Sequence, residues 1–356
     1  MVNTAIMWIM AVGAAVGGLD RLFGNRLGLG KKFEEGFMLM GPTALSMAGI
    51  ICLTPLISDF LKQAAVPLWH ALGLDPALLG GILAIDMGGY QLSMELADLP
   101  AMGLYSGIVI SATFGCTVSF TIPVGMGMLQ EEERTAFAQG ILIGLGCMPA
   151  ALVIGGLFCG LSAVQVLVQS IPVFAVSLVL TAGIAKFPTA TIKGFSIFAG
   201  FIRILATVGL IAGAVQYMTG FQMIKGIAPV EEAMAVVASI GVVMLGSLPV
   251  AEFLKRALDR PFRWIGRKTG MSANGAAGLL LGIVSPVPAI TEMKEMDSLA
   301  RIVNAAFLVC GASAIAAHTG FTFSTQPQLV GPLLAAKLSG GLLSAASAFA
   351  FSRKKR

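Results

Sequence analysis

Charged residues, histidines and paired cysteines are scarce in this 356-residue chain, and each scarcity excludes a class of protein. Asp, Glu, Lys and Arg make up 12% of the residues, far below a soluble globular domain. Two histidines cannot build a zinc site that depends on several histidines. The five cysteines stand singly in apolar runs without Cys-x-x-Cys spacing, which predicts neither a disulfide framework nor a metal site. Nucleophile and nucleotide motifs are also missing, so we expect no enzyme and no cofactor.

Apolar residues are abundant instead. They make up 56% of the chain, and the mean hydropathy is +0.88. These values predict an all-α polytopic membrane protein, with residues 1–356 forming a single transmembrane domain in the lipid bilayer. The net charge of +5 comes largely from short basic segments at 21–32, 255–268 and 353–356, which indicate membrane orientation rather than nucleic-acid binding. We expect all three segments on the cytoplasmic side, with Met1 outside.

Apolar runs of bilayer-spanning length predict about eleven or twelve transmembrane helices, two of them broken or re-entrant. The predicted spans are 2–19, 37–53, 55–72, 76–98, 101–126, 136–159, 164–184, 192–218, 233–253, 273–297, 299–317 and 329–351.

The first broken segment, 76–98, places a carboxylate in mid-span. Its apolar run 78–85 is too short to cross a bilayer, and it continues into Asp86 and the pair Gly88-Gly89. We expect a half-helix ending at Ile85 and Asp86, whose negative dipole end together with the carboxylate suits a cation. A charge at this depth costs at least ~2.5–3.5 kcal/mol, so Asp86 is predicted to be functional. The alternative is that it caps local backbone or pairs with Lys337 or Arg203.

The second broken segment, 273–297, is interrupted at Ser285-Pro286-Val287-Pro288 and ends in an acidic stretch, 292–297. Paired interruptions in two halves of a chain point to a transporter binding site. The two segments therefore suggest repeat halves at about 33–125 and 231–320, although broken apolar runs also arise by chance in a chain with 44 glycines.

Further polar residues accompany the breaks. Glu95 faces either a cavity or the interface, and His318 is either a relay or a hydrogen-bonded packing residue. Tyr90 could meet an ammonium group through its ring. The remaining substrate-binding candidates are Gln91, Ser285 and Asn304, as partners for a small polar group, and Glu34 and Glu35, which could instead stabilise a helix start.

Several of these blocks occur together in one known family. They are Phe33-Glu34-Glu35-Gly36-Phe37, Asp86-Met87-Gly88-Gly89 with Glu95, Gly194-Phe195-Ser196-Ile197-Phe198, Met293-Lys294-Glu295-Met296-Asp297 with Asn304, and His318 with Gly320-Phe321. In this order the chain resembles the bacterial ethanolamine permeases of the ethanolamine-utilisation locus. The resemblance implies a multi-pass protein of the bacterial cytoplasmic (inner) membrane that takes up ethanolamine.

Residue pattern and resemblance agree on a cationic substrate. Ethanolamine carries an ammonium group, so we expect Asp86 to bind it, with Tyr90 and Glu95 contributing and Asn304 as a polar wall. Ser285 and Ala317 depart from the family's usual residues, which leaves a related small amine as an alternative substrate. An uncoupled facilitator, a homo-oligomer, a membrane scaffold and, less favoured, an intramembrane enzyme also remain open.

Overall fold

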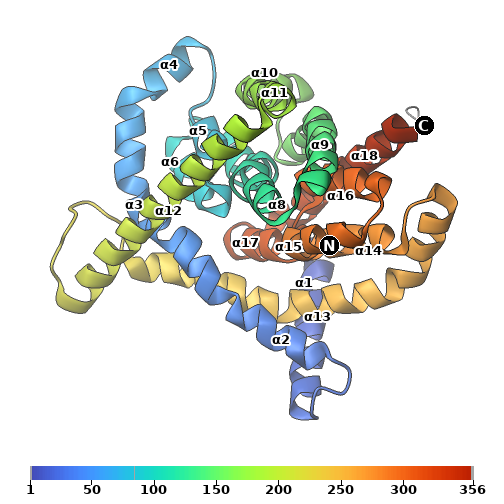
Figure 1. Ribbon diagram of the computed structural model, residues 1–356. Coiled ribbons are helices and arrows are strands. Elements are labelled where there is room, and N and C mark those ends of the chain that lie inside the picture. Colours follow the sequence, from blue (N-terminus) through green and yellow to red (C-terminus); the bar gives the residue numbers. More distant parts are fainter. Residues whose placement is uncertain (1, 84, 354–356) are drawn as a thin grey trace.

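The computed structural model describes residues 2–83 and 85–353, and within these residues every regular element is a helix (Figure 1). In chain order the elements are α1 (Val2–Leu22), α2 (Leu29–Met38), α3 (Met40–Ala64), α4 (Val66–Ala71), α5 (Leu78–Ile82), η1 (Asp86–Gly88), α6 (Gly89–Leu96), α7 (Pro100–Leu104), η2 (Tyr105–Gly115), η3 (Thr117–Thr121), α8 (Ile122–Met128), α9 (Glu131–Phe158), α10 (Ala163–Gln169), α11 (Ile171–Lys186), α12 (Pro188–Thr219), α13 (Val230–Thr269), α14 (Ala273–Val284), α15 (Pro286–Thr291), η4 (Glu292–Glu295), α16 (Ser298–Gly311), α17 (Ala317–Thr325), η5 (Pro327–Leu329) and α18 (Val330–Arg353). Elements η2 and η3 are π-helical, whereas η1, η4 and η5 are 3₁₀ turns.

Seven helical stretches in the described residues are long and apolar enough to cross a membrane. They are Thr4–Leu22, Leu29–Ala64, Pro100–Met128, Glu131–Phe158, Ile197–Thr219, Val230–Leu258 and Pro327–Arg353. The pair α10 and α11, bent by 50°, adds an eighth if it forms one span. The chain is therefore an all-α, multi-pass membrane protein, as its composition predicts.

The number of long spans is smaller than the predicted eleven or twelve for two reasons. Residues 37–53 and 55–72 were expected as separate spans, but α3 runs through Pro55 and joins most of both. The predicted spans 76–98, 273–297 and 299–317 are instead made of helices of 14 residues or fewer. The two predicted interruptions are thus confirmed as breaks in the helices.

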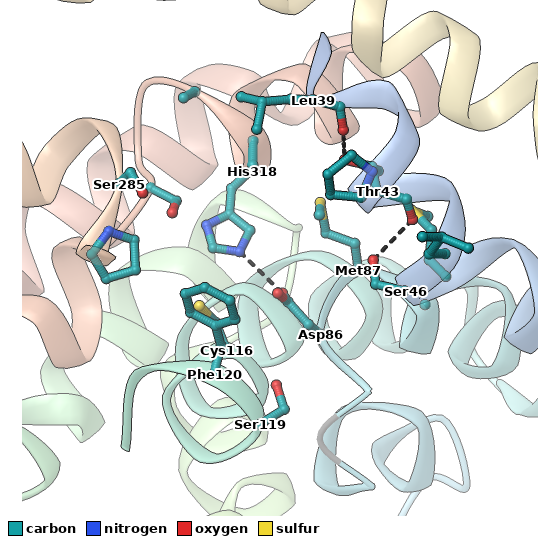
Figure 2. Close-up of a pocket in the computed structure, with 18 of the residues that line it drawn as sticks. Leu39, Thr43, Ser46, Asp86, Met87, Cys116, Ser119, Phe120, Ser285 and His318 are labelled. Carbon is teal, nitrogen blue, oxygen red and sulfur yellow. Dashed lines mark hydrogen bonds and ion pairs between the residues drawn. The ribbon is translucent and has the colours of Figure 1, made fainter. Parts of the chain in front are cut away.

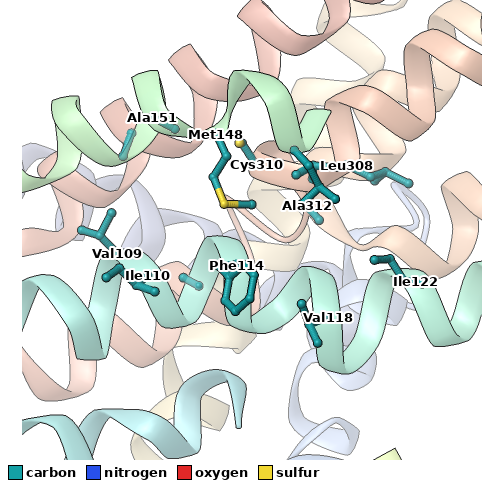
Figure 3. Packing of buried hydrophobic residues seen from close by; sticks show 14 of the residues in the cluster. Val109, Ile110, Phe114, Val118, Ile122, Met148, Ala151, Leu308, Cys310 and Ala312 are labelled. Atoms are coloured by element: carbon teal, nitrogen blue, oxygen red, sulfur yellow. The ribbon is translucent and has the colours of Figure 1, made fainter. Parts of the chain in front are cut away.

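Small residues let the central helices approach closely. Gly140 and Gly144 of α9 lie against the backbone of α16, and Gly340 of α18 lies against Ala151 and Cys310. Figure 3 shows the apolar side chains that fill the space between these helices and η2, including Phe114 at its centre. Close approach of this kind is the usual basis of helix association in lipid, where burial of apolar surface contributes little.

A second group of helices, α1, α2 and α13, packs along one flank of this core (Figure 1). The turn between α1 and α2 is held by Asp20, whose carboxylate accepts backbone N–H groups of Leu27, Leu29 and Gly30 at 2.8–2.9 Å. Arg256 of α13 donates to the Leu27 carbonyl at 2.6 Å. The basic segments 21–32 and 255–268 therefore lie together, as a shared membrane side requires. Met1 and residues 354–356 of the third segment lie outside the described residues, and the side itself stays a prediction.

Candidate functional site

The chain around Asp86 leaves regular helical geometry. Helix α5 ends at Ile82, and the next turn, η1, begins at Asp86, so the predicted half-helix reaching Ile85 and Asp86 is wrong by about one turn. Asp86 has a positive φ of 53°, a conformation that Asp tolerates better than most side chains. Within the described residues, the other non-glycine residues with positive φ are Asn25 and Ser313. Asp86 and Ser313 line the same cavity, so backbone strain is concentrated there.

The glycine pair after Asp86 was expected to break the helix, but in the structure it allows close helix packing. Gly88 and Gly89 adopt helical backbone angles and do not themselves break the helix. A side chain on Gly89 would meet the carbonyl oxygen of Gly80 at 2.5 Å and the Ser111 hydroxyl at 3.0 Å. Gly89 is therefore needed for close packing of α6 against α5 and η2.

Three interruptions of the helices meet at one cavity of about 500 Å³ (Figure 2). They are the break at Asp86, the extended residue Ser285 between α14 and α15, and the segment 312–316 between α16 and α17. The last two are joined by backbone hydrogen bonds, from Ser313 N–H to the Gly282 carbonyl at 3.0 Å and from Ile315 N–H to the Ile283 carbonyl at 3.1 Å. Irregular backbone at membrane depth is tolerated where it lines such a cavity.

Asp86 and His318 form the polar centre of this cavity. The Asp86 Oδ1 atom and the His318 Nε2 atom are 3.0 Å apart, and His318 Nδ1 lies 3.2 Å from the Ala312 carbonyl oxygen. The Asp86 side chain is 26% exposed and the His318 side chain only 2%, so Asp86 is reachable from the cavity while His318 stands behind it. Figure 2 shows the imidazole directed at the carboxylate.

The hydrogen bonds of His318 define where its protons lie. A carbonyl oxygen can only accept, so Nδ1 must donate to Ala312. The facing atoms, Nε2 and Asp86 Oδ1, would then both be acceptors unless a proton lies between them. One proton therefore joins the pair, and the other oxygen of Asp86 remains available to a ligand.

Hydroxyl groups on the cavity wall present acceptors rather than donors. Thr43 donates its hydroxyl proton to the Leu39 carbonyl and Ser46 donates to the Thr43 carbonyl, both at 2.8 Å. Ser119 donates to the Gly115 carbonyl at 2.8 Å. Each hydroxyl oxygen keeps lone pairs for a ligand. Together with Asp86, these oxygens favour a ligand rich in N–H donors.

Two basic residues lie near the site. Lys337 of α18 is fully buried and donates to the Ala112 carbonyl within η2, where π-helical turns displace carbonyls from the ordinary α-helical pattern. It lies near Asp86 but forms no ion pair with it among the described residues. Arg203 of α12 is exposed and lines the cavity. Of the alternatives considered for Asp86 in the sequence, pairing with Lys337 is thus absent from the described residues, and His318 supplies the hydrogen bond.

The structure brings three of the predicted substrate-binding residues, Asp86, Ser285 and His318, to the cavity. Tyr90 lies away from its lining: the hydroxyl accepts from Gln326 at 2.9 Å, and the ring packs edge-on against Phe321 with centroids 5.6 Å apart.

The other predicted residues have separate environments. Glu95 is exposed on α6, and the Gln91 side-chain oxygen is buried. Asn304 is buried and donates to the carbonyls of Gly275 and Ala300 at 2.8 and 2.9 Å. Glu34 pairs with Arg21 at 2.6 Å and Glu35 with Lys32 at 2.5 Å, both at the surface.

Asp297, in the acidic stretch after the second break, has a structural position. Its carboxylate accepts from the N–H groups of Ser272 at 2.6 Å and Ala300 at 3.0 Å, and it begins α16. Burial by itself would raise the pKa of the Asp297 carboxyl, but these donated hydrogen bonds outweigh burial and hold the pKa below its ordinary value.

Sequence reasoning missed Cys116, because the spacing of the five cysteines predicted no metal site. Cys116 is the single residue between η2 and η3, and it lines the cavity. The ligand atoms of Asp86, Cys116 and His318 all lie within 4.8 Å of one another, so these three residues could hold a metal ion. The available sequence signal was weak: a run of Ser, Thr and Gly around Cys116 within an apolar span.

Comparisons with known proteins identify relatives along the whole chain. Residues 2–351 match the family model described as "Ethanolamine utilisation protein, EutH". A Listeria monocytogenes protein named "Probable ethanolamine permease EutH" is 36% identical over 97% of this chain and 93% of its own length. An Escherichia coli K12 protein of the same name is 33% identical over 96% and 93%, and the Bacillus subtilis protein YxeR is 34% identical over 98% and 94%. No solved structure matches the chain. Family model and relatives together show that the chain belongs to the EutH family of ethanolamine utilisation proteins.

Proposed function

We propose that this protein is a permease that carries protonated ethanolamine across the bacterial cytoplasmic membrane, and that Asp86 binds the ammonium group. The permease names of its relatives and its multi-pass fold support transport. The observation that carries the proposal is the Asp86 carboxylate, exposed to a cavity at a helix break between membrane-embedded helices. Ionisable groups within spans are expensive and usually belong to substrate or ion pathways.

The chemistry of the cavity suits the substrate. Ethanolamine at neutral pH is almost wholly a cation, since a primary ammonium such as that of lysine has a pKa of ~10.4. Its N–H groups would bond to the free oxygen of Asp86 and to the hydroxyl oxygens of Thr43 and Ser46. The substrate hydroxyl would meet Ser285, whose side chain faces the same cavity in Figure 2. Phe120 and Met87 supply apolar walls for the two methylenes.

The arrangement of the breaks fits a transporter. Interrupted helices near the membrane midplane commonly hold the substrate of secondary transporters, because they expose backbone groups inside a protected cavity. Here the break at Asp86 and the break at Ser285 belong to the two proposed repeat halves, 33–125 and 231–320, and both reach one cavity. We include the repeat in the proposal.

Counterflow in proteoliposomes tests the proposal. Vesicles containing purified protein and loaded with unlabelled ethanolamine should accumulate labelled ethanolamine, and the recovered label should be chemically unchanged. Excess external ethanolamine should compete, whereas ethane-1,2-diol, which lacks the ammonium group, should not. Counterflow failing in protein-containing vesicles, or equal competition by the diol, would contradict the proposal.

Two variations of the assay separate the alternatives. Imposing a proton or sodium gradient distinguishes coupled uptake, which the gradient accelerates, from an uncoupled facilitator. Methylamine and propanolamine as competitors distinguish ethanolamine from a related small amine, because the first lacks the hydroxyl and the second lengthens the chain. A chemically altered product would indicate an intramembrane enzyme instead.

A further inference from the structure

We propose that Asp86, Cys116 and His318 form a binding site for a divalent transition-metal ion of the zinc class, in the wall of the cavity. The three residues come from distant parts of the chain: η1, the junction of η2 and η3, and α17. Their ligand atoms are a carboxylate oxygen, a thiol sulfur and an imidazole nitrogen, all within 4.8 Å of one another.

The distances are close to those of a bound state. Zinc bonds of 2.0–2.3 Å in a tetrahedron place neighbouring ligand atoms about 3.3–3.6 Å apart. The Asp86 and His318 atoms are already 3.0 Å apart, so this pair needs only to open slightly. Because all three atoms lie within 4.8 Å of one another, the Cys116 thiol needs to approach by at most about 1.5 Å, within reach of a rotamer adjustment.

The imidazole of His318 is oriented as metal-bound histidines are. Metal-binding histidines usually donate their second ring N–H to a carbonyl or carboxylate, which fixes the tautomer and directs the other nitrogen at the metal. His318 Nδ1 donates to the Ala312 carbonyl, and Nε2 points at Asp86. The two facing acceptors, 3.0 Å apart, require a positive charge between them. A proton supplies it in the metal-free protein, and a metal ion can supply it instead.

Charge and ligand type select the ion. The mixed oxygen, nitrogen and sulfur set suits Zn²⁺ or Co²⁺, whereas Mg²⁺ and Ca²⁺ prefer oxygen ligands alone. Asp86 and a thiolate at Cys116 would together neutralise the two positive charges of the ion. The metal complex would therefore add no net charge beside the buried Lys337 side chain. The fourth coordination position would face the cavity.

A metal ion at this place has a consequence that rests on the proposed function. It would place a divalent ion directly beside the Asp86 oxygen that the substrate ammonium needs, so charge repulsion and lack of space should make zinc-class ions and ethanolamine exclude each other. Zinc would then inhibit amine uptake by competition at Asp86.

Cobalt absorption tests the site without any transport measurement. Purified protein in detergent, titrated with Co²⁺ at neutral pH, should show a near-ultraviolet charge-transfer band from thiolate to cobalt together with visible bands of four-coordinate cobalt. Zn²⁺ should abolish both by displacement. Cys116→Ser should remove the charge-transfer band. His318→Gln should weaken metal affinity at least about 100-fold, because loss of a residue that binds the metal directly should exceed the roughly 10- to 100-fold loss typical of a residue that only supports a ligand. Cys159→Ser replaces another buried cysteine, outside the cavity lining, and should keep the wild-type spectrum.

The wild-type titration decides the matter even if a variant fails to fold. Absence of a charge-transfer band in wild-type protein would overturn the site, as would a band that persists in Cys116→Ser. Competition is measured separately, by repeating the titration with ethanolamine present and a protein-free blank to correct for metal held by the amine in solution. If cobalt binds and ethanolamine does not compete, the metal site stands and the placement of the ammonium at Asp86 fails.

Discussion

Replacing Asp86 by asparagine removes from the cavity the carboxylate and the proton that it shares with His318. Asparagine has nearly the same size and tolerates the left-handed backbone found at this position. Its amide NH₂ can donate to Nε2 of a neutral His318, so the hydrogen bond between the two residues can be kept in the variant. The change relieves a partly buried charge, so we expect the variant to fold and reach the membrane in normal amounts.

The expected loss of affinity follows from the bond that disappears. A hydrogen bond between an ammonium and a carboxylate contributes about 1.5–3 kcal/mol, and an amide oxygen recovers only part of it. Because about 1.4 kcal/mol corresponds to a factor of ten, ethanolamine should bind Asp86→Asn roughly ten- to hundredfold more weakly. The wall hydroxyls at Thr43 and Ser46 remain, so some binding should survive.

Titration calorimetry of ethanolamine into purified protein measures this loss directly. Asp59→Asn is the matched control, because it makes the same substitution at an exposed position on α3, where Asp59 pairs with Lys62 at 3.7 Å, outside the cavity lining. It should bind ethanolamine as the wild type does. If Asp86→Asn is well folded and binds with unchanged affinity, Asp86 serves only to hold His318 in place, and the ammonium must bind elsewhere in the protein.

Four further outcomes are expected. Gly49→Leu should lower the free energy of unfolding in detergent by about 1–3 kcal/mol or more, since even a Cβ there collides with the Ala206 carbonyl of α12. The control Gly41→Ala, on the same helix with open space around it, should leave that free energy unchanged. Asp297→Ala should lower the free energy of unfolding by about 0.5–2 kcal/mol at neutral pH, because α16 loses its N-terminal cap. Since folding lowers the pKa of Asp297, this stability difference should be full above the unfolded-state pKa and vanish as pH falls through the folded-state pKa, which unfolding measured at stepwise lower pH would show. Arg26→Cys, at an exposed position in the basic segment 21–32, should resist an impermeant thiol reagent added to intact cells if that segment is cytoplasmic. Cells lacking the protein should fall behind the wild type on scarce ethanolamine chiefly at acidic pH, where the neutral, lipid-permeable amine is rarest, and an equal deficit in alkaline medium would contradict a role in carrying the cation.

The sequence by itself determined the class of the protein and the places where its helices break. A helix satisfies its own backbone hydrogen bonds inside a bilayer, so apolar composition and apolar runs of about 20 residues identify a multi-pass all-α protein without knowledge of packing. The break at Ser285 and Pro286 is equally local, because proline lacks the N–H that a continuing helix needs. The charge of Asp86 in an apolar run was visible for the same reason.

Only the tertiary structure decided which residues meet. Asp86 and His318 are 232 positions apart, and nothing local in either segment requires their contact. The closure of the cavity depends on how three interrupted segments dock, which also excluded Glu95 and Tyr90 from its lining although they lie within ten residues of Asp86. Cys116 reads as an apolar packing residue until the π-helical turns on either side place its thiol beside the pair. Hydropathy and helix propensity depend on residues that are close in sequence. A site of three side chains depends on the distances between residues far apart in sequence, and the packing of the helices fixes those distances.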